Sequence, residues 1–201
     1  MKKGIFLLIL CFSITNLYAQ NEKKNMIGTY TAFGTGAYGR IKPYEGGGSY
    51  NTKYYYTIGL DYSRTLSERW DLCSGLEYTY NDMTIKPSFT GVGQPLSNVH
   101  LTLVTVPVQF KYHFGKLAYF NGGTFLNILA KDSDKYRPNV AMLLGIGFGI
   151  GFKHEFNSGI MLSLNPYTRF NGIGNLSLHS ESIKDYKYLQ GGVSFGVGYK
   201  F

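Results

Sequence analysis

The chain has 201 residues and a formal net charge of +8, and its basic residues are scattered with no run of like charge, which argues against a nucleic-acid partner. The mean hydropathy of −0.12 is low for a helical membrane protein. The 26 glycines, 18 tyrosines and 14 phenylalanines favour a sheet protein with a crowded interior and aromatic belts.

The first residues have the pattern of a secretory signal peptide. Lys2 and Lys3 form a basic start, an apolar stretch follows over 4–15, and Ala19 is a small residue at a cleavage point before Gln20. A permanent anchor is the alternative, but the apolar stretch is short for one. We therefore expect 1–19 to be a cleaved signal peptide and 20–201 to be one domain. That domain holds one cysteine, so it has no internal disulfide.

Eight segments of this domain are predicted strands, because apolar residues alternate in them with small or polar residues, which is the period of a β-strand. The faces of 27–38 are the hardest to assign, and 117–129 alternates least regularly. The segment 140–155 is the clearest, with apolar residues at even positions and glycines at 145, 147, 149 and 151. A spanning helix needs about 20 apolar residues, whereas about 9–11 suffice for a tilted membrane strand. The predicted strands are 27–38, 54–66, 70–80, 99–114, 117–129, 140–155, 160–170 and 188–201.

The connections between these strands are alternately long and short, as in outer-membrane barrels with long extracellular loops and short periplasmic turns. Charged residues lie opposite the apolar rows, which excludes a soluble barrel with an apolar interior. The predicted fold class is therefore all-β, an eight-stranded antiparallel up-and-down transmembrane β-barrel in the outer membrane. Its predicted lumen network comprises Asp61, Glu77, Lys111, Lys153, Glu155 and Arg169.

Two further expectations concern details of the wall. Pro107 and Pro166 fall within predicted strands, where each removes a backbone donor, so we expect bulges at both. Aromatic residues near the strand ends predict two interfacial girdles. The periplasmic girdle comprises Trp70, Tyr112, Phe114, Phe152 and Tyr199, and the outer girdle comprises Tyr54, Tyr56, Tyr80 and Phe170.

Three segments carry a resemblance to a known family. The segments 104–115 (VTVPVQFKYHFG), 121–124 (NGGT) and 196–201 (GVGYKF) resemble the outer-membrane protein β-barrel domain family of Gram-negative bacteria, the OmpA-like eight-stranded barrels, and in particular its PorT-like group. The similarity covers residues 26–201. The OmpA-like resemblance implies an outer-membrane location, and the PorT-like resemblance implies an accessory role in protein export.

Three functions are compatible with such a barrel. An eight-stranded barrel is just wide enough for its side chains to fill it, so paired charges that plug the lumen are expected, and an ion path through them is the alternative. A lipid-modifying enzyme would need a nucleophile and a base, for which His179, Ser180, Glu181 and Ser182 are the one local candidate. We expect no enzyme activity, catalytic residue, metal site or cofactor, since no metal-ligand or phosphate-loop spacing is present.

The remaining hypothesis places function in the long connections. Exposed loops on a rigid scaffold are where binding residues concentrate. These connections carry the aromatic residues Tyr44, Tyr50, Phe89, Tyr136 and Tyr186. The expected partners are outer-membrane lipid and envelope or secretion proteins, and the sequence does not identify an extracellular ligand for the loops.

Overall fold

The structure is a computed structural model that describes residues 24–40, 49–86, 97–132, 142–175 and 186–201. The predicted signal peptide lies outside these ranges. Within them the chain forms eight strands. These are β1 (Asn25–Arg40), β2 (Ser49–Ser67), β3 (Trp70–Lys86), β4 (Ser97–Phe114), β5 (Ala118–Asp132), β6 (Met142–Glu155), β7 (Ile160–Asn175) and β8 (Tyr186–Lys200). No helix of this described part is long and apolar enough to cross a membrane.

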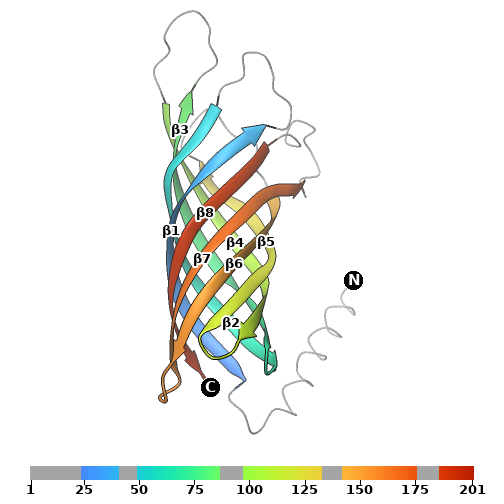
Figure 1. The fold of residues 1–201 in the computed structure, drawn as a ribbon. Helices are drawn as coiled ribbons and strands as arrows, with labels where there is room; N and C mark the ends of the chain where they lie inside the picture. The colour runs from blue at the N-terminus through green and yellow to red at the C-terminus, as the bar shows by residue number, and fades with distance from the viewer. Residues whose placement is uncertain (1–23, 41–48, 87–96, 133–141, 176–185) are drawn as a thin grey trace, which may run out of the picture.

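The eight strands form one closed barrel (Figure 1). Each strand pairs antiparallel with the next, and β1 pairs with β8 along nearly its whole length, from Met26 opposite Lys200 to Arg40 opposite Tyr186. The backbones of Asn25 and Phe201 also exchange two hydrogen bonds, of 3.1 and 2.8 Å. Closure leaves no sheet edge unpaired, which is the condition for strands to cross lipid. The predicted fold class is confirmed.

The two ends of the barrel differ. The turn end carries the three short connections, which are 68–69, 115–117 and 156–159, and the chain's C-terminus lies at this end in Figure 1. Gly115 and Gly159 adopt φ values of 75° and 86° in two of these turns, a conformation that glycine favours. The other end, called here the loop end, is where the four long connections join the strands. In outer-membrane barrels the short turns are periplasmic.

Burial is inverted relative to a soluble barrel. Along β2, Ile58 and Leu60 point outward and are 57% and 61% exposed. Thr57, which points into the lumen, is 1% exposed. The same alternation runs along β6, where Ile146, Phe148, Ile150 and Phe152 are exposed and the intervening glycines are buried. A surface this apolar is stable only against lipid, so the wall faces a membrane and the polar residues face the lumen.

The predicted bulges at Pro107 and Pro166 are wrong. The register of β3 with β4 is the same on both sides of Pro107, and that of β6 with β7 is the same on both sides of Pro166. Each proline interrupts the ladder on one side and stays paired on the other, Pro107 opposite Phe125 and Pro166 opposite Val193. A proline lacks one donor but can keep an extended backbone, so the strand continues in register.

The strands are longer at the loop end than predicted. β2 begins at Ser49 rather than 54, β3 continues to Lys86 rather than 80, and β7 continues to Asn175 rather than 170. The prediction ended each strand where the apolar rows ended, but the hydrogen-bonded ladder continues through polar sequence. Residues predicted as loop, such as Asn81 and Asn171, therefore belong to the wall.

The aromatic residues gather near both ends of the wall. Trp70 packs against Tyr112 with ring centroids 4.9 Å apart, and Tyr112 packs against Phe114 at 5.0 Å, beside the turns. Toward the loop end, Tyr56 stacks on Tyr80 at 5.2 Å. These two groups of rings lie where interfacial girdles are expected.

Because the outer wall faces lipid, a charge placed on it is expected to destabilise the barrel. An Ile146→Arg substitution places a charge against lipid near the middle of β6 and is expected to cost about 2–4 kcal/mol of unfolding free energy. Urea titration of the barrel in lipid vesicles, followed by Trp70 fluorescence, measures this. Ser158→Arg, in an exposed turn, is the control and should change stability little. Equal costs at the two positions would contradict the assignment of faces.

Candidate functional site: a polar lumen

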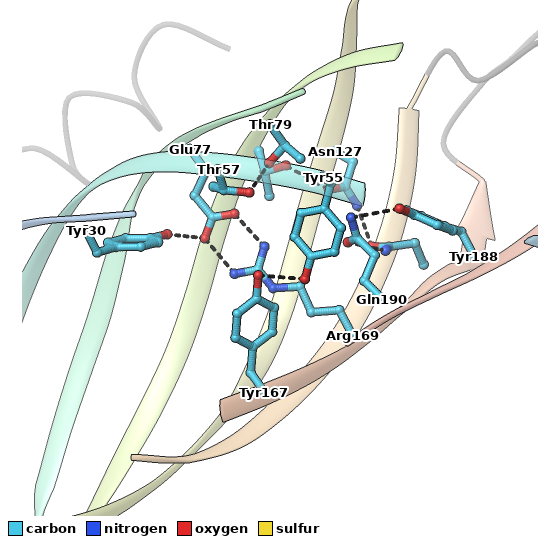
Figure 2. A network of polar contacts seen from close by, with 12 residues as sticks. Tyr30, Tyr55, Thr57, Glu77, Thr79, Asn127, Tyr167, Arg169, Tyr188 and Gln190 are labelled. Carbon is cyan, nitrogen blue, oxygen red and sulfur yellow. Dashed lines mark hydrogen bonds and ion pairs between the residues drawn. The ribbon is translucent and has the colours of Figure 1, made fainter. Parts of the chain in front are cut away.

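Glu77 on β3 and Arg169 on β7 form an ion pair across the middle of the lumen (Figure 2). Arg169 Nη1 donates to Glu77 Oε2 at 2.6 Å and Nη2 donates to Oε1 at 2.9 Å, so the contact is bidentate. The Tyr30 hydroxyl from β1 donates to the same carboxylate. The guanidinium lies over the rings of Phe125, at 4.2 Å, and Tyr167, at 4.7 Å.

Because this ion pair is buried, losing either partner would destabilise the barrel. The side chain of Glu77 is 1% exposed and that of Arg169 is 11% exposed. A buried charge without a partner costs several kcal/mol, and the two side chains compensate each other through two charge-assisted hydrogen bonds. The contact therefore joins the β3 side of the wall to the β7 side and fills the space between them.

A continuous chain of hydrogen bonds, called here the polar belt, circles the lumen toward the loop end. It begins and ends on β4 and takes donors and acceptors from β5, β7, β8 and β3. The bonds run from Thr105 to Asn127 (2.8 Å), Asn171 (2.8 Å), Gln190 (3.1 Å), Tyr188 (3.2 Å), Asn81 (2.9 Å) and the Leu101 carbonyl (3.3 Å). All seven of its residues are also buried. Such a satisfied network rigidifies the interior.

The polar belt takes no side chain from β6, because a glycine lies where the belt crosses that strand. Asn127 on β5 bonds directly to Asn171 on β7, although β6 lies between these strands in the wall. A side chain on Gly145 of β6 would collide with Asn171 Oδ1. The absence of a side chain there is what allows the two amides to meet.

Three further pairs lie toward the turn end. His113 Nε2 is 2.6 Å from Asp71 Oδ2, Lys111 Nζ is 3.9 Å from Asp61 Oδ2, and Lys200 Nζ is 3.5 Å from Glu155 Oε1. The Lys200–Glu155 pair is about one-third exposed, in contrast to the Glu77–Arg169 pair. The exposure of the paired side chains therefore rises mainly at Lys200–Glu155, the pair at the strand ends.

Glycines in the wall make room for the largest lumen side chains. The Tyr30 ring lies over Gly59, the Tyr119 ring lies over Gly151, and Arg169 and Phe125 lie over Gly147. A methyl group at any of these positions would meet the facing side chain at less than normal contact distance. The alternating glycines of the sequence thus mark where bulky residues of neighbouring strands project inward.

The structure places five of the six residues of the predicted lumen network in three separate ion pairs. Glu77 bonds Arg169 and Asp61 lies near Lys111, whereas Glu155 contacts Lys200, outside the predicted set. Lys153, the sixth predicted residue, is not a member of these pairs. Tyr30 was not predicted because apolar and polar residues do not alternate clearly in 27–38. Asn81 and Asn171 were not predicted because both lie beyond the apolar rows of their strands.

The chemistry available in this lumen is hydrogen bonding and charge pairing. No group of His, Cys, Asp and Glu residues within the described ranges has the arrangement of a metal site. The His113–Asp71 pair resembles two members of a catalytic triad, but His113 Nδ1 is buried with no hydrogen-bond partner in the described structure. A triad requires a nucleophile at that second nitrogen. The candidates His179–Ser182 lie outside the described residues.

Comparisons with known proteins support the fold. No family model matches the chain, and no curated protein matches it. The outer membrane protein OprG from Pseudomonas aeruginosa aligns with a TM-score of 0.57 at 13% identity, over 89% of this chain and 96% of that one. Neisserial surface protein A (NspA) aligns with a TM-score of 0.51 at 13% identity, over 88% and 97%.

The solved structures share the closed barrel, and the wall of this chain is apolar outside and polar inside. The protein is an eight-stranded outer-membrane β-barrel. The resemblance to OmpA-like barrels is confirmed at the level of the fold, while the PorT-like relation stays a prediction. The protease OmpT from Escherichia coli also aligns, with a TM-score of 0.46 at 7% identity over 88% of this chain and 97% of that one, and this carries no argument about activity.

The ion pair makes a prediction about stability. Glu77→Gln leaves the Arg169 guanidinium buried without an acid and is expected to lower the unfolding free energy by about 3–5 kcal/mol. The double variant Glu77→Leu/Arg169→Met removes both charges and is expected to recover most of this loss. Urea titration in lipid vesicles measures both. A double variant as unstable as the single one would show that packing, not charge compensation, is what the pair supplies.

The glycine positions make a second prediction. Gly151→Ala is expected to destabilise the barrel by about 1–3 kcal/mol because the new methyl group overpacks against the Tyr119 ring. Gly191→Ala is the matched control, since nothing lies within 4 Å of the position its methyl would take. The shift in urea midpoint of each variant checks the difference. Equal shifts would mean that glycine acts through backbone freedom alone.

Proposed function

We propose that the protein is a closed, non-conducting outer-membrane barrel that holds its extracellular connections in a fixed arrangement for adhesion or for contact with envelope or secretion proteins. The observation that carries this is the Glu77–Arg169 pair across the lumen, with the polar belt beyond it. Together they fill the cross-section of the barrel with side chains bonded to one another. Function then falls to the connections at the loop end, since loops on a rigid scaffold carry binding residues.

The rigidity of the scaffold favours this proposal. The Glu77–Arg169 pair links β3 to β7, the Tyr55 and Tyr167 hydroxyls link β2 to β7 at 2.9 Å, and the polar belt links five strands. Strands β2 to β4, the longest of the barrel, extend the wall beyond its apolar rows toward the loop end. The connections therefore emerge from a wall whose strands cannot shift independently.

A small ion path is the second candidate, since charged residues line the lumen from Glu155 to Arg169. Planar-bilayer recording separates it from the proposal. The wild-type barrel is expected to show no ion steps. Arg169→Ala, which opens space between the Phe125 and Tyr167 rings, is the variant in which steps would first appear. Steady conductance of the wild type that changes when Arg169 is neutralised would establish the ion path instead.

The binding role has its own experiment. Cross-linking in intact outer membranes, followed by purification through a C-terminal tag and mass spectrometry, is expected to recover a reproducible set of envelope or secretion proteins. Replacement of the 87–96 connection by a short Gly-Ser linker should remove some of them and leave barrel stability unchanged. A barrel that emerges without partners in both forms would redirect the proposal toward ligands outside the cell.

The absence of enzyme activity stays a prediction. Esterase activity of the purified barrel, assayed with a long-chain acyl ester and lost on His179→Ala, would contradict it. Ser180→Ala and Ser182→Ala would then test whether either hydroxyl is the nucleophile.

A further inference from the structure

An open pocket of about 490 Å³ lies at the turn end of the barrel, where the β2–β3 turn meets the end of β4. Its lining includes Glu68 and Arg69 from that turn, Tyr112 and Phe114 from β4, and Lys116 from the β4–β5 turn. The backbone N–H of His113 donates to the Arg69 carbonyl at 2.9 Å, which ties the first turn to β4. The pocket is therefore built on a fixed backbone.

The aromatic side chains of this pocket place it beside lipid. Tyr112 and Phe114 continue the outward row of β4, and Phe114 is 58% exposed. The Tyr112 ring packs between Phe114 and Trp70, so three rings of the girdle border the pocket. Girdle rings lie at the level of the lipid headgroups. The pocket is therefore next to the headgroups of the periplasmic leaflet.

Positive charge is in excess in the pocket. Arg69 and Lys116 are both exposed, and neither belongs to the lumen ion pairs described above. Glu68 is the one acid among the residues of its lining. Arg69 Nη1 donates to the Tyr112 hydroxyl at 3.3 Å, so the guanidinium is held beside the girdle rings and the hydroxyl keeps its own proton to donate.

A phosphate group suits this set of donors. A guanidinium binds phosphate oxygens through two parallel hydrogen bonds, and an ammonium group adds a point charge. The excess of positive charge favours a headgroup with a net negative charge over a zwitterionic one. The rings on the membrane side of the donors suit acyl chains, which a soluble phosphate lacks. A phospholipid satisfies both requirements in one molecule.

We propose that this pocket binds one anionic phospholipid of the periplasmic leaflet, of the phosphatidylglycerol class. Arg69 and Lys116 hold its phosphate, the Tyr112 hydroxyl donates to it, and its acyl chains lie along the rings of Trp70 and Phe114. This goes beyond the proposed anchoring role and does not depend on it.

Trp70 is a native reporter of the site. It is the sole tryptophan of the chain, and its ring centroid lies 4.9 Å from that of Tyr112. Bromine atoms on an acyl chain quench tryptophan fluorescence at short range. Quenching in phosphatidylcholine vesicles that contain a fraction of one brominated lipid therefore measures how strongly that lipid is preferred beside Trp70. Both leaflets have the same composition, so the orientation of the barrel does not matter.

The experiment compares brominated phosphatidylglycerol with brominated phosphatidylethanolamine at low salt. Phosphatidylglycerol is expected to be preferred by about fivefold, because cations near a membrane surface attract anionic lipid. The preference should fall at high salt, since exposed charges are screened. Equal quenching by the two lipids in the wild type would overturn the proposal.

Matched variants separate the pocket from the general charge of the turn end. The double variant Arg69→Gln/Lys116→Gln is expected to lose the preference. Lys24→Gln is the control and should keep it, because Lys24 is a cation at the turn end that does not line the pocket. Heat-dependent gel mobility confirms that each variant is folded. A preference that persists in the double variant, or that Lys24→Gln removes equally, would show diffuse attraction instead of a site.

Glu68→Gln tests the sign of the effect. It removes the acid of the pocket and is expected to strengthen the preference for phosphatidylglycerol, because the positive charge is then opposed by no carboxylate of the lining. Loss of a merely structural contact would not strengthen lipid binding. A weaker preference in this variant would contradict the proposal.

Discussion

A backbone that crosses lipid must satisfy all of its hydrogen bonds internally, and this requirement governs the molecule. The pairing of β1 with β8 meets it by removing the sheet's two edges. Closure also fixes which face of every strand is inside, because a one-residue slip would turn each apolar row into the lumen. The apolar exterior and the polar lumen both follow from that single closure.

The closed wall then creates a second problem, because its narrow interior is filled with polar side chains and none of the buried ones can be left without a partner at low cost. The chain uses two solutions. At the middle and the loop end, Glu77, Arg169 and the polar belt bond to one another across the lumen. At the turn end the Lys111–Asp61 and Lys200–Glu155 pairs are longer and more exposed than the Glu77–Arg169 pair, and Lys111 and Asp61 line a cavity. Glycines such as Gly147 and Gly151 let bulky neighbours occupy the space that a side chain would take.

Much of the fold was predictable because alternate residues of a membrane-barrel strand face lipid and the polar lumen, so the sequence alternates between apolar and polar residues. The period-two rows indicated the eight strands, least clearly in 27–38 and 117–129, and the charges opposite the apolar rows indicated which face of the wall is apolar. The strand ends and the belt were not predictable in this way. Asn81, Asn171 and Gln190 are polar residues whose meaning depends on which strands lie opposite, and sequence spacing does not reveal this. Pro107 and Pro166 misled because a missing donor interrupts one side of a ladder without shifting its register.

The pairing of β1 with β8 also constrains how the molecule folds. Met26 lies opposite Lys200, so the bonds that seal the barrel join the beginning of the described chain to its end. Contacts between such distant segments form slowly, since the chain between them must first lose its conformational freedom. The unsealed sheet would present two long edges, with their unpaired donors and acceptors, until the last strand arrives. Sealing is therefore the step at which this chain is most exposed to aggregation and most in need of assistance.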